Sequence, residues 1–454
     1  MKFEDVLAEV NGFGKFQIRT VLLTAIPRIS LPLHFLLNNF IAAIPPHHCD
    51  ISSLDDGGIF RNLSQAERLV VSIPVQEDGT QSSCQMFTEP QYHLLLNSSN
   101  ITELQTVPCQ DGWVYDNSTF KSTLASDWDL VCDNRRANKA AATIFFMGVM
   151  VGAAVFGYLS DRFGRKSMLL VSYIVAAVFG IASAFSFNYT MFAVMRFFTG
   201  FGISGIGFIT VALCVEWVDI KHRAVVSVLA SLDWSFGMAL LSLIAYSVRD
   251  WRYLTVIANT PLILAMATWR WVPESARWLI SNGKIQKAHF YLRKCAQVNG
   301  REQFMADLKP EKPPTSILFS FLPCFLDLAV SQVSNDMGVF RTAVAALGKM
   351  FSEGAFTTVY LYTTELYPTV MRQNGLGFCS FAARFGVSVA PLIMVLEEVW
   401  GHLPGTVFTL VAFVCGMATL CLSDTSKVRL PETIEDVEQT RRRSDTSSEE
   451  KSPL

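Results

Sequence analysis

The sequence predicts an all-helical protein that crosses a membrane several times. Charged residues make up only 17% of its 454 residues, AVILMFWYC residues make up 51%, and the mean hydropathy is +0.32. Soluble domains carry about 25% charged residues. The apolar residues are also gathered into stretches of about 20 residues, which is the length that a helix needs to cross a bilayer.

In the first part of the chain, the polar segment 1–17 is expected to be a cytoplasmic N-terminus, because it lacks the pattern of a cleaved signal peptide. The first span is predicted at 18–44, and a large loop follows at 45–138. Five further spans are predicted within 139–272, at 139–159, 167–187, 190–214, 225–247 and 253–272. A polar central loop at 273–315 comes next.

The C-terminal half is shorter. Its predicted spans lie within 316–422, at 316–333, 342–364, 375–398 and 402–422. The first of these is marginal, because it is short and carries Asp327. The segment 423–454 is polar and charged, which predicts a disordered tail. Its last residues, 452–454, fit the loose pattern of a PDZ-domain ligand.

Lysine and arginine indicate the orientation, because they gather on the cytoplasmic side of membrane proteins. The central loop 273–315, the short loop 160–166 and the tail are basic. All three fall on the same side as residue 1, so the loop 45–138 lies outside. We therefore expect a multi-pass plasma-membrane protein with both termini in the cytoplasm.

The loop 45–138 has two features of an extracellular segment. It contains N-x-S/T sequons, which are glycosylation acceptors, and an even number of cysteines, which suits disulfides in an oxidising space. The predicted glycosylation sites are Asn62, Asn97, Asn100 and Asn117, and the disulfide candidates are Cys49, Cys84, Cys109 and Cys132. Four cysteines allow three connectivities, which the sequence leaves open.

Two short signatures recur in the same order along the chain. They are Glu216 with Arg223, repeated as Glu365 with Arg372, and Pro-Glu-Ser at 273–275, repeated as Pro-Glu-Thr at 431–433. Each copy follows a predicted span. This recurrence predicts two homologous helical halves related by a parallel repeat.

The loop after the second span carries the most specific motif of the chain. Residues 157–166 read GYLSDRFGRK, a pattern G-x-L-x-D-R-x-G-R-K in which glycine lets helices approach closely and the charges can latch a gate. With the repeated charges, the predicted gating residues are Gly157, Asp161, Arg162, Gly164, Arg165, Lys166, Glu216, Arg223, Glu365 and Arg372. The alternative is that these charges are only interfacial anchors.

These motifs resemble those of the organic anion and cation transporters, which are solute carrier family 22 of the major facilitator superfamily. The likeness runs in order through AAIPPHHC, PCQDGWVYD, LSDRFGRK, PESARWL, TELYPTVMRQNGLG and LPETIEDVE, and it is greatest to the organic anion transporters. The resemblance implies a major facilitator fold with two helical halves and alternating access around a central cavity.

The sequence departs from that plan in its C-terminal half. The family implies twelve spans, whereas about ten can be placed here, because 316–333 is the only candidate between Arg301 and Gly348. About two spans are therefore missing. Two hypotheses stay open: transport of small organic anions, or a truncated, non-transporting member that arose by splicing or a gene-model deletion or that modulates full-length paralogues.

Arg384 is the main candidate for substrate binding. Ionisable residues inside spans are costly and face the bundle interior, and Arg384 falls near the middle of 375–398. The resemblance places it on the basic residue that anion carriers use. One hypothesis is that Arg384 binds a substrate anion; the other is that it pairs with Asp233 of the span 225–247.

Other cavity residues are predicted from spacing and chemistry. His34 and Asn38 are four residues apart, so they share a helix face, and Arg28 between Pro27 and Pro32 predicts a broken first helix beside the cavity. Aromatic side chains could form walls for a ring-bearing substrate. The aromatic candidates are Trp234, Phe351, Phe356, Tyr360 and Tyr362, which would otherwise be core residues.

The sequence contains no Walker loop, no G-x-S-x-G, no H-E-x-x-H and no Cys/His spacing for a metal. We therefore expect no enzyme activity, no catalytic residues, no cofactor and no metal. No basic segment with interspersed aromatic residues predicts nucleic-acid binding. The expected partners are a small organic anion, a counter-anion for exchange and membrane lipid.

Overall fold

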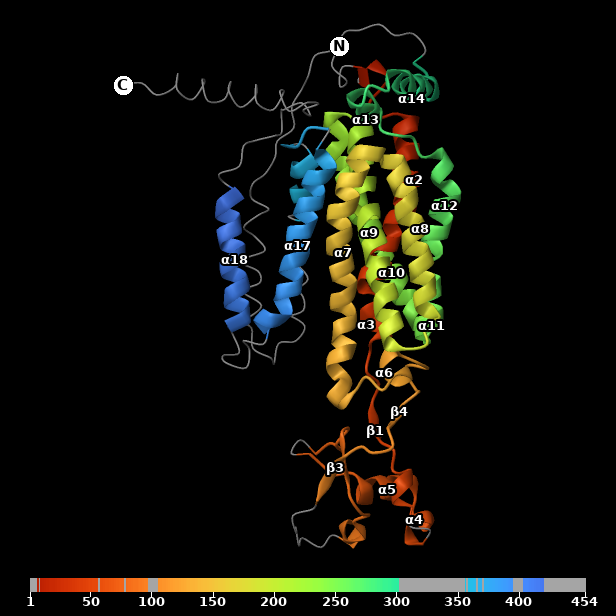
Figure 1. Ribbon diagram of the computed structural model, residues 1–454, viewed down its shortest axis with the longest axis vertical. Coiled ribbons are helices and arrows are strands. Elements are labelled where there is room, and N and C mark those ends of the chain that lie inside the picture. The colour runs from red at the N-terminus through yellow and green to blue at the C-terminus, as the bar shows by residue number, and fades with distance from the viewer. Residues whose placement is uncertain are drawn as a thin grey trace, which may run out of the picture.

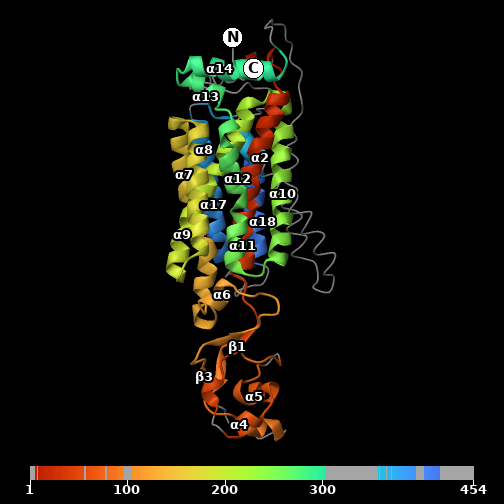
Figure 2. The same ribbon diagram turned by 90° about the vertical axis from the view of Figure 1, so that its right-hand side faces the viewer.

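The computed structural model describes residues 6–301, apart from 8, 56–57, 77–78 and 97–104, and residues 356–394 and 403–419, apart from 357, 365 and 370. Its long helices run side by side along the long axis of the molecule (Figures 1 and 2). We call residues 6–301 the N-terminal half and the described residues from 356 onward the C-terminal half.

The N-terminal half is a helical bundle around α9, which packs against α2, α7 and α8. Its bundle helices are α2 (Lys15–Leu36), α3 (Asn38–Ile41), α7 (Arg135–Phe163), α8 (Arg165–Ala184), α9 (Tyr189–Trp217), α10 (Arg223–Ser247), α11 (Trp251–Ala258) and α12 (Thr260–Thr268). The last two occupy the predicted span 253–272 and are separated at Asn259, whose N–H bonds to carbonyls of the preceding turn.

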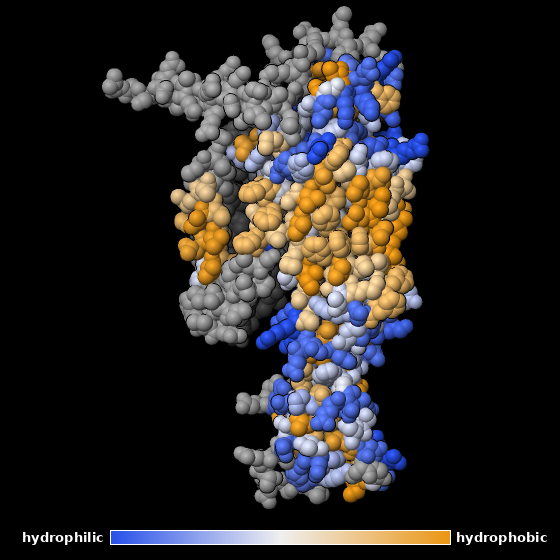
Figure 3. Space-filling model, in the orientation of Figure 1, coloured by the Kyte–Doolittle hydropathy of each residue, from blue (hydrophilic) through white to orange (hydrophobic). Residues whose placement is uncertain are grey.

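Within the described part of the chain, five helices are long and apolar enough to cross a membrane. They cover 15–41, 132–163, 165–184, 189–217 and 225–247. Figure 3 shows the apolar side chains as a band across the bundle, with polar residues beyond both of its edges. The band is the surface that lipid covers, because only apolar side chains are stable against hydrocarbon.

Helix α2 is continuous, so the prediction of a broken first helix was wrong. Pro27 and Pro32 both lie inside it. Each proline removes the one backbone hydrogen bond that its N–H would make four residues back, and the rest of the helix continues past both of them. Membrane helices tolerate proline in this way.

One end of the bundle, which we call the α14 end, is crossed by short helices (Figure 1). These are η4 (Ile220–His222), η5 (Trp269–Trp271), α13 (Ala276–Ser281) and α14 (Ile285–Val298). Helix α14 is amphipathic and buries Ala288, Leu292 and Cys295. Asn299, just after it, accepts a hydrogen bond from the backbone N–H of Phe16 at 2.9 Å, which joins α14 to the start of α2.

A small domain projects from the opposite end of the bundle (Figure 1). Strand β1 (His47–Cys49) pairs antiparallel with β4 (Trp113–Tyr115), and β2 (Gln85–Phe87) pairs with β3 (Thr106–Pro108). Its helical turns are η1 (Ser52–Leu54), α4 (Ile59–Asn62), α5 (Gln65–Ser72), η2 (Tyr92–Leu96), α6 (Leu124–Asp127) and η3 (Cys132–Asn134). Two disulfides, Cys49–Cys109 and Cys84–Cys132, hold this domain together and use all four candidate cysteines.

The C-terminal half contributes helical residues around 358–364, then α17 (Arg372–Met394) and α18 (Leu403–Thr419). Helix α17 packs along α7. Glycines permit this close approach: a Cβ added to Gly377 would lie 2.6 Å from the carbonyl oxygen of Ala153, and one added to Gly157 would lie 2.8 Å from that of Gln373. The predicted span 316–333 and most of 342–364 lie outside the described residues.

The projecting domain generates a prediction about glycosylation. Asn62 and Asn117 are exposed on it, whereas Asn97 and Asn100 lie outside the described residues. If this domain faces the cell exterior, glycosidase treatment of the membrane-expressed protein will increase its gel mobility. The shift will shrink stepwise in Asn62→Gln and Asn117→Gln. Identical mobility before and after treatment would contradict this orientation.

Candidate functional site

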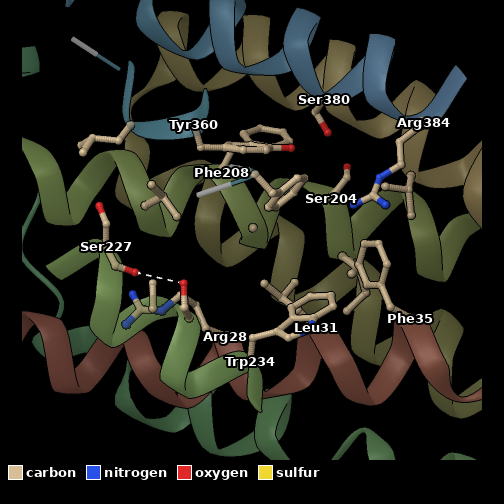
Figure 4. A pocket seen from close by; sticks show the side chains of 18 residues that line it. Arg28, Leu31, Phe35, Ser204, Phe208, Ser227, Trp234, Tyr360, Ser380 and Arg384 are labelled. Carbon is tan, nitrogen blue, oxygen red and sulfur yellow. Dashed lines mark hydrogen bonds between the residues drawn. The ribbon is translucent and has the colours of Figure 1, made fainter. Parts of the chain in front are cut away.

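A cavity of about 140 Å³ lies between the two halves. Its walls come from α2, α7, α9 and α10 on one side and from α17 and residues 356–361 on the other. The lining is mostly apolar and aromatic. The lining residues labelled in Figure 4 are Arg28, Leu31, Phe35, Ser204, Phe208, Ser227, Trp234, Tyr360, Ser380 and Arg384.

Arg384 brings a guanidinium into this cavity from α17. Its Cζ lies 4.4 Å from the ring centroid of Phe35 on α2 and 5.7 Å from that of Phe146 on α7. Cations bind the faces of aromatic rings at such distances, so Arg384 connects the C-terminal half to two helices of the N-terminal half. In Figure 4 the hydroxyl groups of Ser204 and Ser380 lie on the same side of the cavity as Arg384.

Three of the predicted aromatic residues, Trp234, Phe356 and Tyr360, line the cavity; Tyr362 is not part of the lining, and Phe351 lies outside the described residues. The Phe356 and Tyr360 rings lie 4.7 Å apart, and Trp234 contacts Phe35 edge-on at 5.6 Å. The two pairs stand on opposite halves. A planar substrate placed between them would contact aromatic surface from both halves, which is the usual composition of a small-molecule pocket.

Asp233 pairs with Arg28, so the predicted pairing of Asp233 with Arg384 was wrong. Nε and Nη2 of Arg28 donate to Asp233 Oδ2 at 2.9 and 2.6 Å. Helix α10 packs against α2, and this packing brings Asp233 beside Arg28. From sequence, Arg28 was identified only by its neighbouring prolines, because spacing along separate helices does not show which of them pack together.

His34 and Asn38 lie away from the cavity lining. Both contact Arg196 of α9, whose Nη2 donates to the His34 carbonyl at 3.3 Å and to Asn38 Oδ1 at 3.5 Å. Arg196 also lies 4.5 Å from the ring centroid of Phe145. The shared face expected of His34 and Asn38 therefore packs on α9, and Arg196 is a buried cation that sequence reasoning missed.

Three of the predicted gating residues, Asp161, Arg165 and Arg372, gather at the α14 end around a fourth, Glu216, which is fully buried at the end of α9. Its Oε1 accepts from Arg165 Nη2 at 3.2 Å and from Arg372 Nη1 at 3.0 Å. Arg165 starts α8 and Arg372 starts α17. One carboxylate therefore joins two helices of the N-terminal half to one of the C-terminal half.

Two further bonds cross between the halves beside Glu216. Arg165 Nη2 donates to the Thr369 carbonyl at 3.0 Å, and the Asn374 N–H donates to Asp161 Oδ2 at 3.0 Å. Asp161 also pairs with Arg165 at 3.1 Å. Both halves therefore take part in a charged layer at the α14 end.

The remaining gating candidates divide into three groups. Gly157 and Gly164 serve backbone geometry: Gly157 lies at the α7–α17 contact, and Gly164 has a φ of +102°, which a side chain would strain. Arg223 is buried, and its positive charge repels that of Arg372.

Two other gating candidates lie outside the Glu216 cluster. Arg162 is exposed and donates a hydrogen bond to the Tyr158 hydroxyl, and Lys166 Nζ donates one to the Arg270 carbonyl. Glu365 is outside the described residues.

Glu274 is a residue of this layer that the gating set did not include. Its carboxylate accepts from the N–H groups of Lys166 and Ser275 at 3.1 and 3.0 Å, so it caps the start of α8. Burial raises the pKa of Glu274, although these N–H groups act in the opposite direction. Trp278 Nε1 donates to the Asp161 carbonyl at 2.7 Å. The repeated Pro-Glu-Ser signature was the available signal.

Several curated proteins are similar to this chain over nearly its whole length. Bovine and human solute carrier family 22 member 7 are each 38% identical, covering 97% of this chain and 96% of the relative. Solute carrier family 22 member 6-A of Xenopus laevis is 32% identical, covering 97% and 94%. Residues 115–316 also match the family "Sugar (and other) transporter".

Solved structures show the same fold. The proton:xylose symporter XylE, a major facilitator superfamily protein, superposes with a TM-score of 0.56 at 14% identity, covering 94% of this chain and 99% of the symporter. An inward-open structure of XylE from E. coli gives a TM-score of 0.51 at 14% identity. This likeness establishes the major facilitator fold.

The Glu216 cluster generates a stability prediction. Glu216→Gln removes the charge that two buried guanidiniums share, and breaking a buried pair from one side typically costs about 3–5 kcal/mol. Thermal unfolding of the purified protein should show a large fall in Tm. Asp55→Asn is the matched control, since its pair with Arg61 is exposed and such pairs contribute about 1 kcal/mol or less. An equal fall in Tm in the two variants would contradict the central role of Glu216.

Proposed function

The chain belongs to solute carrier family 22 of the major facilitator superfamily, whose members are membrane transporters of organic solutes, and we propose that this chain transports small organic anions. The observation that supports this choice is Arg384. Its guanidinium stays protonated at any physiological pH and stands in the wall of a mostly apolar cavity between the halves.

The cavity chemistry suits an anion with an aromatic body. Arg384 and the hydroxyl group of Ser380 offer hydrogen-bond donors to a carboxylate or a sulfate, whereas the hydroxyl group of Ser204 donates to the Phe201 carbonyl. Phe35, Trp234 and the Phe356–Tyr360 pair offer ring faces to the rest of the molecule. We therefore place the anionic group of the substrate at Arg384 and its ring between the aromatic walls.

Transport would follow alternating access, in which the two halves rock about a fixed site. We propose that the protein lies in the plasma membrane with the α14 end in the cytoplasm. The arrangement described here is then closed to the cytoplasm. Opening on that side requires breaking the Glu216–Arg372 pair and the bonds from Arg165 to Thr369 and from Asn374 to Asp161.

The second candidate function is that of a non-transporting member, and two observations favour it. The alignment to the bovine relative runs over 535 positions, whereas this chain has 454 residues, so part of the relative has no counterpart here. In α10, only 11% of the residues in its apolar stretch are buried against other parts of the protein. An incomplete C-terminal wall would leave the cavity unable to seal during transport.

Arg384→Ala tests the substrate proposal. Loss of the guanidinium should reduce uptake of a labelled aromatic monocarboxylate such as benzoate by tenfold or more, because hydrogen bonds to charged groups contribute about 1.5–3 kcal/mol. Surface biotinylation must show equal expression. Arg61→Ala, which removes an exposed arginine of the projecting domain, should leave uptake unchanged.

The two candidate functions are separated by the same assay. A wild-type chain that reaches the surface, binds benzoate when purified and carries none of it supports the non-transporting alternative. Wild-type uptake that persists in Arg384→Ala would contradict the role given to Arg384.

Asp161→Asn tests the gate. It weakens one bond between the halves, so the inward-facing state should become more populated. Cys214, which is buried beside Arg28 and two residues from Glu216, should then react faster with a maleimide supplied from the α14 end. Both variants should be made in a protein in which every cysteine other than Cys214 and the four disulfide cysteines is replaced by serine. Arg162→Gln is the control in the same loop, and a rate in Asp161→Asn equal to that control would leave only the anchor interpretation.

A further inference from the structure

The cavity wall contains a second guanidinium, that of Arg28, and the protein itself supplies an anion to it. Arg28 is only 4% exposed, and in Figure 4 it lies on the side of the cavity away from Arg384. Its Nε and Nη2 both donate to one oxygen of Asp233. Its Nη1 donates to Thr24 Oγ1 at 3.0 Å and to Cys214 Sγ at 3.5 Å.

This arrangement commits every nitrogen of Arg28 to the protein. A guanidinium binds a carboxylate best through two parallel N–H groups of one edge, and that edge of Arg28 is the one that Asp233 occupies. A substrate carboxylate could reach it only by displacing Asp233. It would also meet the negative charge of Asp233, whose side chain is 20% exposed.

Asp233 is unusual in its own helix. It lies within the apolar stretch of α10 that is long enough to cross a membrane, where a carboxylate is costly unless a cation compensates its charge. It adjoins Trp234, and Ser231 and Trp234 line the cavity. Arg28 therefore lines the cavity with its charge compensated by Asp233, which lies beside the lining residues Ser231 and Trp234.

We propose that Asp233 is a specificity-determining residue, which occupies Arg28 and thereby restricts the cavity to organic anions with one negative charge. This inference rests on the proposed function and narrows its substrate class. A monoanion needs only the cationic side of the cavity at Arg384. A dianion would have to place its second charge near a guanidinium that is already neutralised by an acidic neighbour.

The test compares binding of benzoate with binding of the three benzenedicarboxylates, which place a second carboxylate at different distances from the first. Affinities are measured on the purified full chain by displacement of labelled benzoate. Asp233→Asn removes the negative charge that neutralises Arg28 and leaves only a neutral amide oxygen beside it, which a carboxylate can displace. At least one dicarboxylate should therefore gain about tenfold in affinity relative to benzoate, the effect of one added charged hydrogen bond. In the wild type, benzoate should bind at least as tightly as any of them.

Two variants control for folding and for general charge effects. Asp127→Asn breaks the pair with Arg252 outside the cavity and should keep the wild-type ratio. Arg28→Met/Asp233→Leu removes both charges together and should also keep the preference for the monoanion. If Asp233→Asn is too unstable to purify alone, a dicarboxylate added during purification should raise its Tm more than benzoate does.

The outcomes separate this inference from the function on which it rests. A wild-type chain that binds none of these anions contradicts the proposed function. Benzoate binding with an unchanged ratio in Asp233→Asn overturns only the role of Asp233. A weaker affinity for every anion in Asp233→Asn would show that Asp233 orients Arg28, and it would overturn the inference as well.

Discussion

The buried carboxylate of Glu216 is the interaction on which the arrangement of the two halves depends. It accepts from Arg165 and Arg372, which begin helices on opposite sides of the interface. Removing three charged groups from water is costly, and only a closely packed geometry with further hydrogen bonds compensates it. The glycines at the α7–α17 contact supply that packing, because they allow the helix backbones to approach until the charges meet.

The same constraint explains the other cations of the membrane region. Each guanidinium is placed where the protein offers it an electron-rich partner, which is the carboxylate of Asp233 for Arg28 and aromatic rings for Arg196 and Arg384. The partners differ in kind, and so do the consequences. A carboxylate satisfies Arg28 and withdraws it from ligands, whereas ring faces position Arg384 without neutralising its charge.

Much of the fold could be predicted because its signals are local. A run of about 20 apolar residues is long enough for a helix to cross the bilayer, and helices α7, α8, α9 and α10 coincide with the spans predicted from such runs. The GYLSDRFGRK loop and the ordered motifs indicated the family, which the solute carrier relatives confirm, and the likeness to XylE confirms the fold. Among the site residues, the aromatic candidates and Arg384 were found because large or charged side chains inside a span stand out.

The sequence by itself therefore determined which segments are apolar enough to cross a membrane, which loop carries the disulfides, and that the charge of Arg384 inside a span needs compensation. Only the tertiary structure decided which groups are partners. Asp233 pairs with Arg28, Arg196 donates a hydrogen bond to the His34 carbonyl, and Cys49 forms a disulfide with Cys109. The physical reason is that burial of an apolar helix depends on its own composition, whereas a hydrogen bond depends on the distance between two atoms. Residues 28 and 233 are far apart in the chain, and only the packing of α2 against α10 brings them together.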